Sequence, residues 1–177
     1  MEFNLDLVQT QNPVIGREFL TWLWYLTEAR GNVFSLPDGA SFTLNLEQRI
    51  TVQGGEGENA ETAVCSGLMT EMREARTGLK TGKKVQQAKV RIQKDSMEWT
   101  VALDAANLNL TGMKTPKIDT SDNDDAPDAL VLEKIYLLEK GTQCIDAAFA
   151  LFLKKRLDAD WEQERQAMRK WIINEEN

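Results

Sequence analysis

The chain has 177 residues, 42% of them hydrophobic and 28% charged, with a formal net charge of -7 and no histidine. Such a chain can bury a real core as one domain, and its composition argues against wholesale disorder. Its longest apolar runs are well short of the ~20 residues that cross a bilayer, and its first residues lack a secretory pattern. We therefore expect a cytoplasmic protein with no membrane contact.

The residues that are missing exclude several kinds of catalytic and metal site. Without histidine, Ser-His-Asp and Cys-His pairs and mixed zinc sites cannot form, and two cysteines are too few for a zinc ribbon. We expect Cys65 and Cys144 to be buried free thiols. None of the 12 lysines follows an acid by two residues, the spacing of a restriction-type nuclease core, and no Walker motif or dinucleotide fingerprint is present. The sequence predicts no enzyme, no metal and no cofactor.

The first third of the chain predicts strands around one helix. Alternating apolar residues at positions 3–8 favour a short strand, and Asn12-Pro13 is typical of a helix start. This helix should end at Gly31. Between residues 42 and 52 the apolar residues occupy even positions. A hairpin at Glu47-Gln48 would pair polar with apolar residues, so one long bent strand is favoured.

The middle of the chain predicts a strand over 61–66, a helix over 69–80 and then a three-stranded antiparallel meander at about 84–112. A two-residue turn at Asp95-Ser96 places Ile92 opposite Trp99 and Val90 opposite Val101. A second tight turn at Ala105-Ala106 would place Leu103 opposite Leu108. Lys89 and Arg91 then lie on the polar face of the sheet.

The last third predicts an acidic loop or linker over 115–128 and a helical part over 129–177. The acidic segment reads as a solvated linker or as a mimic of DNA that covers basic residues. The first helix of the helical part, with a bend expected at Gly141, should be deeply buried over 145–153, either in the core or at a subunit interface. Asp160 and Gln163 suggest the start of a final helix. Residues 1–177 thus predict a single α+β domain, an antiparallel sheet packed against an N-terminal helix and two C-terminal helices.

Between residues 73 and 94 the sequence concentrates positive charge. Eight basic residues and one acid give this segment a formal charge of +7, while the rest of the chain carries -14. Clustered lysine and arginine attract phosphate backbones. The eight residues are Arg73, Arg76, Lys80, Lys83, Lys84, Lys89, Arg91 and Lys94.

The same segment resembles a known family. A strand at Glu61–Ser66, a helix through Thr70–Arg76, the turn Gly82-Lys83-Lys84 and a strand leading to Trp99 look like the C-terminal half of the recombination-associated RdgC family. Residues 13–23 are similar to the lead-in of its shorter members. The resemblance implies a non-catalytic, nucleoid-associated protein that binds duplex DNA with little sequence preference, dimerises into a ring and restrains recombinase filaments.

Two functions are therefore expected. In the first, the eight basic residues contact DNA phosphates, duplex DNA being favoured, in a nucleoid-associated homo-oligomer. In the alternative, the chain is a protein-interaction or assembly module whose basic residues meet an acidic partner or the aspartate-rich loop of a second copy.

Overall fold

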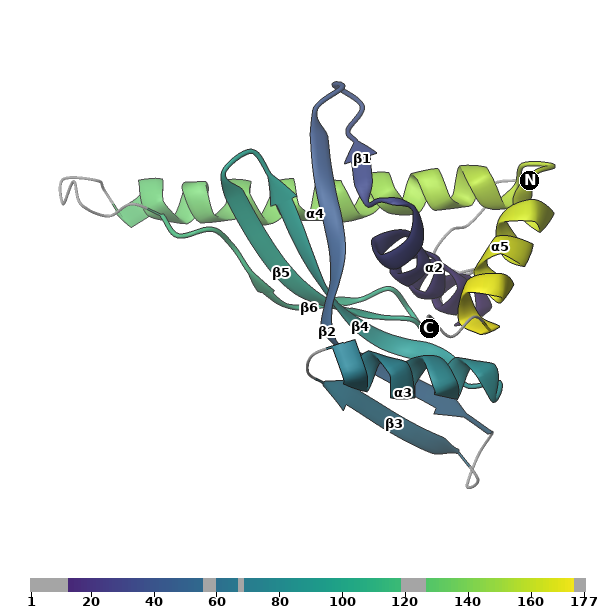
Figure 1. Cartoon of the computed structure of the whole chain (residues 1–177). Helices are drawn as coiled ribbons and strands as arrows, with labels where there is room; N and C mark the ends of the chain where they lie inside the picture. Colours follow the sequence, from purple (N-terminus) through teal and green to yellow (C-terminus); the bar gives the residue numbers. More distant parts are fainter. Residues whose placement is uncertain (1–12, 56–59, 67–68, 119–126, 174–177) are drawn as a thin grey trace, which may run out of the picture.

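The computed structural model describes residues 13–55, 60–66, 69–118 and 127–173. The fold is α+β, as predicted, with an antiparallel sheet packed against the N-terminal helix and the two C-terminal helices (Figure 1). The strand predicted at 3–8 and most of the acidic segment, residues 119–126, lie outside the described residues.

Six strands form the sheet within the described residues, and their bounds are β1 (Val33–Ser35), β2 (Ser41–Gly54), β3 (Glu61–Ser66), β4 (Lys84–Lys94), β5 (Met97–Asp104) and β6 (Leu110–Lys114). On one side β2 pairs first with β1 and then with β3, and on the other side it pairs with β4, which is followed by β5 and β6. The single long strand predicted here is confirmed. A bulge between Leu46 and Ile50 supplies the expected irregularity.

The first hairpin of the meander has the predicted register, with Ile92 opposite Trp99 and Val90 opposite Val101. The predicted second turn is wrong by two residues, because Leu103 pairs with Leu110 rather than with Leu108. The Asp104 carboxylate accepts a hydrogen bond from the Ala106 N–H at 2.7 Å, and the Asp104 carbonyl accepts one from the Leu108 N–H at 2.8 Å. These bonds hold a wider turn, in which Leu108 has a φ of 55°.

The helices lie on one face of this sheet. They are α2 (Pro13–Tyr25), continued by the π-helical turn η1 (Leu26–Arg30), then α3 (Met69–Lys80), α4 (Pro127–Arg156) and α5 (Trp161–Ile173). Gly31 ends the first helix, as predicted, with a φ of 99°. Alternate strand residues such as Ile50, Val90 and Val101 are buried beneath the helices, and the polar residues between them face the other way.

The long helix α4 is continuous through Gly141, where the sequence suggested a bend. Gly141 instead allows α4 to approach the sheet closely. A Cβ at this position would lie 2.9 Å from the Trp99 ring and 3.2 Å from the Met113 sulfur. The Trp99 indole N–H donates to the carbonyl of Leu137 at 2.8 Å, which fixes this contact.

The core contains the aromatic rings of Phe19, Trp22, Phe34 and Phe152, which pack against one another. The deep burial predicted for 145–153 is confirmed at Ile145, Ala148 and Phe152. Cys65 and Cys144 are both buried, as predicted. Within the described residues, no helix combines the length and apolar character that a membrane crossing requires.

Candidate functional site

The eight basic residues lie on both sides of the sheet rather than on one surface. Helix α3, which carries Arg73, Arg76 and Lys80, packs on the helix-covered face, where Gly78 lies against Val52. Lys89 and Arg91 alternate with the buried Val90 and therefore point to the open face. Alternation within β4 could be predicted from the sequence, but the side of the sheet on which α3 packs could not.

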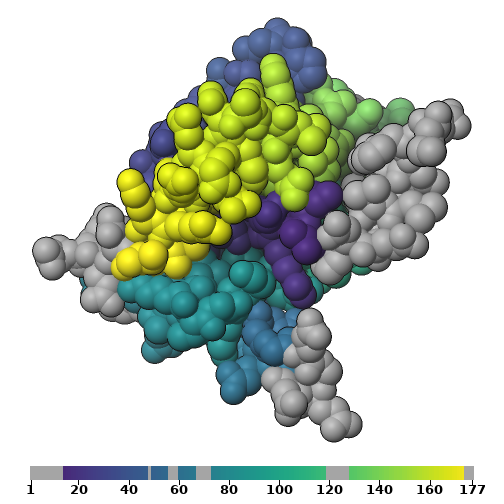
Figure 2. All heavy atoms as spheres, turned by 90° about the vertical axis from the view of Figure 1, so that its right-hand side faces the viewer, coloured from purple at the N-terminus to yellow at the C-terminus, as the bar shows by residue number. Residues whose placement is uncertain are grey.

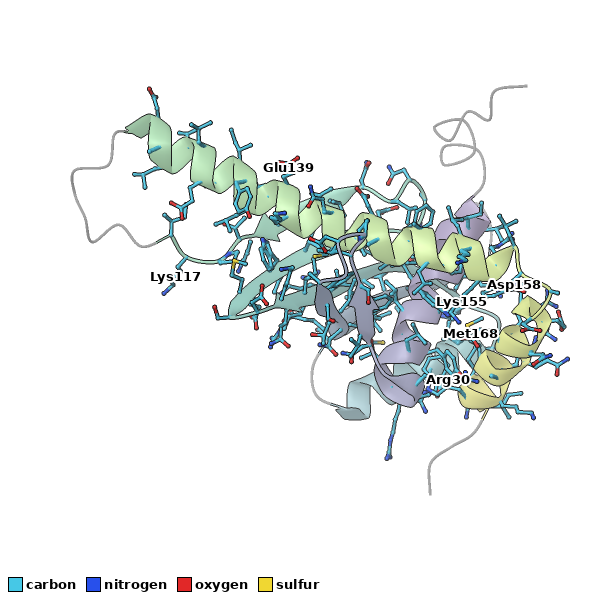
Figure 3. All side chains as sticks on the ribbon, turned by 90° about the horizontal axis from the view of Figure 1, so that it is seen from above. Arg30, Lys117, Glu139, Lys155, Asp158 and Met168 are labelled. Carbon is cyan, nitrogen blue, oxygen red and sulfur yellow. The ribbon has the colours of Figure 1, made fainter. Side chains whose placement is uncertain are left out.

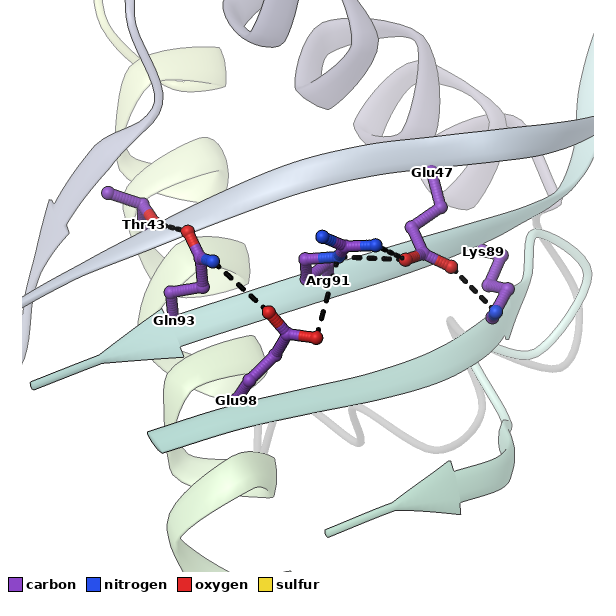
Figure 4. Close-up of polar contacts among 6 residues, drawn as sticks. All are labelled: Thr43, Glu47, Lys89, Arg91, Gln93 and Glu98. Atoms are coloured by element: carbon purple, nitrogen blue, oxygen red, sulfur yellow. Dashed lines mark hydrogen bonds and ion pairs between the residues drawn. The ribbon is translucent and has the colours of Figure 1, made fainter. Parts of the chain in front are cut away.

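On the open face, Glu47 lies between Lys89 and Arg91 (Figure 4). Its carboxylate is 2.6 Å from the Lys89 ammonium and accepts hydrogen bonds of 2.8 and 2.5 Å from the Arg91 guanidinium. Glu98 lies 3.8 Å from Arg91 on the neighbouring strand. The bulge in β2 brings Glu47 opposite Lys89, so two cations and two carboxylates form a network with no formal net charge.

The ionisation of Glu47 follows from these contacts. Partial burial disfavours the charged form, but the hydrogen bonds from Lys89 and Arg91 outweigh it and lower the pKa of Glu47 below its ordinary value of 4.5. Glu47 is therefore ionised at neutral pH. A phosphate group approaching Lys89 or Arg91 would meet this carboxylate.

A polar depression of about 330 Å³ lies beside the network, lined by Asn45, Leu46, Glu47, Arg91 and Gln93. Its side chains already bond one another or close neighbours. Asn45 accepts from Asn32, and Gln93 donates to Glu98 at 3.1 Å. In the part of the chain that the structure describes, no group of His, Cys, Asp or Glu residues could hold a metal ion.

Arg76 joins three helical segments instead of facing solvent. Its guanidinium pairs with Glu28 of η1 and lies 4.9 Å from the centre of the Trp171 ring of α5. Glu28 also accepts hydrogen bonds from the indole N–H groups of Trp24 at 2.6 Å and Trp171 at 3.1 Å. In Figure 2, α5 lies against α2 and against the α3 region, where these contacts occur.

Two more cations have carboxylate partners. Lys83 lies 3.1 Å from Glu61, and Lys94 lies 2.9 Å from Asp95. Five carboxylates pair with cations of this segment: Glu28, Glu47, Glu61, Asp95 and Glu98. Together with Glu74 they set six acids against the eight cations, which reduces the formal charge from +7 to +2. Arg73, Lys80 and Lys84 are exposed, and Arg73 and Lys84 make no ion pair with any described residue.

A different surface stands out at the start of α4. This end of the helix extends past β5 and β6 (Figures 1 and 3). Four large apolar side chains at neighbouring positions of this end are exposed. They are Val131 (57% exposed), Leu132 (66%), Ile135 (53%) and Tyr136 (53%), which we call the α4 patch. Spacings of one, four and five residues place them together on one side of the helix.

Sequence reasoning placed Val131 and Ile135 in a helix but did not single out the α4 patch. The available signal was the absence of a polar face over residues 130–138, where apolar side chains occur on every side of the helix. That pattern predicts a helix that is covered all round. The sheet covers only part of α4, because the start of the helix extends past it (Figure 1).

Comparisons of the chain with family models, with curated proteins and with solved structures find no match. The resemblance to the RdgC family therefore stays a prediction.

Proposed function

We propose that the protein is a non-catalytic protein-interaction module and that the α4 patch is its contact surface. The observation that carries this proposal is the group of four adjacent, half-exposed apolar side chains on a helix end that extends beyond the sheet. Contiguous exposed apolar surface of this kind is typical of a binding site in a soluble domain. The other large exposed apolar side chains in the described residues, such as Val33, Val64 and Leu157, are scattered over different elements.

The size of the patch limits the strength of the interaction. Full burial of one large apolar side chain contributes about 1.5–3 kcal/mol, so covering four that are about half exposed would contribute roughly 3–6 kcal/mol. Association costs at least about 4 kcal/mol in lost freedom of motion. A partner must therefore add contacts outside the patch, and we expect affinities in the micromolar range.

The proposal is tested by selecting binders from a peptide library, with Leu132→Gln/Ile135→Gln as the counter-selected variant. Both side chains are exposed and glutamine is a good helix former, so the variant should keep the fold and the thermal unfolding of the wild type. We expect peptides that bind the wild type and lose at least about tenfold in affinity for the variant. A selection that yields only peptides binding both proteins equally would contradict the proposal.

DNA binding is the second candidate, favoured by the exposure of Arg73 and Lys80 on α3 and of Lys84 at the start of β4. Three phosphate contacts predict a slope of log affinity against log salt of about -3, and six would give about -5. Because Glu47 and Glu98 neutralise Lys89 and Arg91 on the open face, Lys80→Glu/Lys84→Glu should weaken binding more than Lys89→Glu/Arg91→Glu.

A fluorescence anisotropy titration of duplex and single-stranded DNA across a salt series measures both the slope and the two variants. Affinity that does not change with salt would contradict phosphate binding. A role in recombination or in the nucleoid depends on the resemblance alone and stays a prediction.

A further inference from the structure

Two acidic side chains lie in line with the α4 patch, one at each end. Asp128 and Glu139 are exposed and are separated by eleven positions, or about three helical turns, so they lie on the same side of α4 as Val131, Leu132, Ile135 and Tyr136. Glu139 is on the outer side of the helix in Figure 3. Glu133 and Lys134 lie at the two borders of the patch, and Lys140 lies 5.4 Å from the centre of the Tyr136 ring.

This arrangement disfavours a second copy of the chain as the occupant. In an antiparallel pair of α4 helices, the register that places Val131 opposite Tyr136 and Leu132 opposite Ile135 also places Asp128 opposite Glu139. In a parallel pair related by a twofold axis, each carboxylate meets its own copy. Either arrangement puts like charges together, which is unfavourable. A register shifted by one turn separates them but leaves half of the patch uncovered.

We propose that the α4 patch binds a basic amphipathic helix of another protein, with Asp128 and Glu139 pairing with its lysine or arginine side chains. This inference rests on the proposed function and adds the chemistry of the partner. The partner's apolar stripe would cover the four patch residues, and its cations, spaced by about three turns, would supply the contacts that the patch alone lacks. The charge pairs also select against an acidic helix of the same apolar content.

The test uses two fluorescein-labelled peptides about five helical turns long that share one leucine stripe and carry either lysine or glutamate elsewhere. The full chain should bind the lysine peptide about tenfold more tightly than the glutamate peptide. Sedimentation of the protein alone should show a monomer. Glu139→Lys should reduce this preference several-fold.

Two matched control variants distinguish binding at the α4 patch from a general attraction of the lysine peptide to an acidic protein. Glu74→Lys makes the same charge change at another exposed helical position and should leave the preference unchanged. Leu132→Gln/Ile135→Gln should abolish binding of the lysine peptide. Leu157→Gln, which replaces a leucine that is 82% exposed outside the patch, should not.

The contrary outcomes distinguish the two proposals. Equal binding of both peptides that is lost in Leu132→Gln/Ile135→Gln overturns the choice of a basic partner and leaves the interaction surface in place. A dimer that dissociates in that variant shows that a second copy occupies the α4 patch. This result overturns the inference of a basic partner helix but leaves the proposed interaction function in place. A monomer that binds neither peptide overturns the inference, and the library selection then decides the proposed function independently.

Discussion

Arg73 and Arg76 are separated by about one turn on α3, yet they have different surroundings. Arg73 is exposed, whereas the Arg76 side chain is 19% exposed between Glu28 and the Trp171 ring. Sequence analysis could place both residues on a helix. It could not identify Glu28 or Trp171 as partners, because these contacts depend on how three helical segments pack.

Arg76→Gln should therefore destabilise the protein by about 1–3 kcal/mol, because it removes a charge-assisted hydrogen bond and a cation–π contact and leaves Glu28 without its cation. Urea unfolding followed by tryptophan fluorescence measures this loss. The matched change Arg73→Gln should cost less than about 0.5 kcal/mol. Equal losses in the two variants would contradict the role given to Arg76.

Glu47→Gln tests the network on the open face. Since Lys89 and Arg91 are 38% and 43% exposed, the expected loss at neutral pH is about 1 kcal/mol or less. The pKa of Glu47 is lower in the folded than in the unfolded state, so its contribution is present above pH 4.5 and is lost as the pH falls through the folded value. The stability difference between wild type and variant should thus shrink in acid. A stability difference that grows as the pH falls would contradict a lowered pKa of Glu47 in the folded protein.

At the scale of elements, side-chain alternation predicted the first hairpin of the meander correctly and the second turn incorrectly. Only one register of this hairpin buries its four apolar side chains together. It pairs Ile92 with Trp99 and Val90 with Val101. The second turn depends instead on local hydrogen bonds of Asp104 and on a left-handed Leu108, which apolar alternation does not indicate.

Gly141 is a position at which α4 approaches the sheet closely. Alanine favours a helix over glycine by about 1 kcal/mol, so Gly141→Ala would stabilise an isolated α4. In the protein, the new Cβ would lie 2.9 Å from the Trp99 ring, and we expect a net loss of about 1–3 kcal/mol. Thermal unfolding measures it, with Gln143→Ala as a control at an exposed position of α4. A variant more stable than the wild type would contradict the close contact.

For the whole molecule, the fold could be predicted from the sequence and the α4 patch could not. Helical and strand periodicity gave the α+β architecture, since each element has one face to bury. The formal charge of +7 in residues 73–94 suggested a binding surface, but packing divides this charge between two faces and pairs much of it with carboxylates. The α4 patch arises because the helix is longer than the sheet that it covers, and periodicity does not reveal such a difference in length.

We propose that the protein binds partners through the start of α4 and not through the basic residues of segment 73–94. Amide NMR shifts, recorded as a library-selected peptide is added to the full chain, locate the contact directly. We expect the largest shift changes to fall between Asp128 and Glu139. Changes confined to residues 73–94, with α4 unaffected, would contradict it.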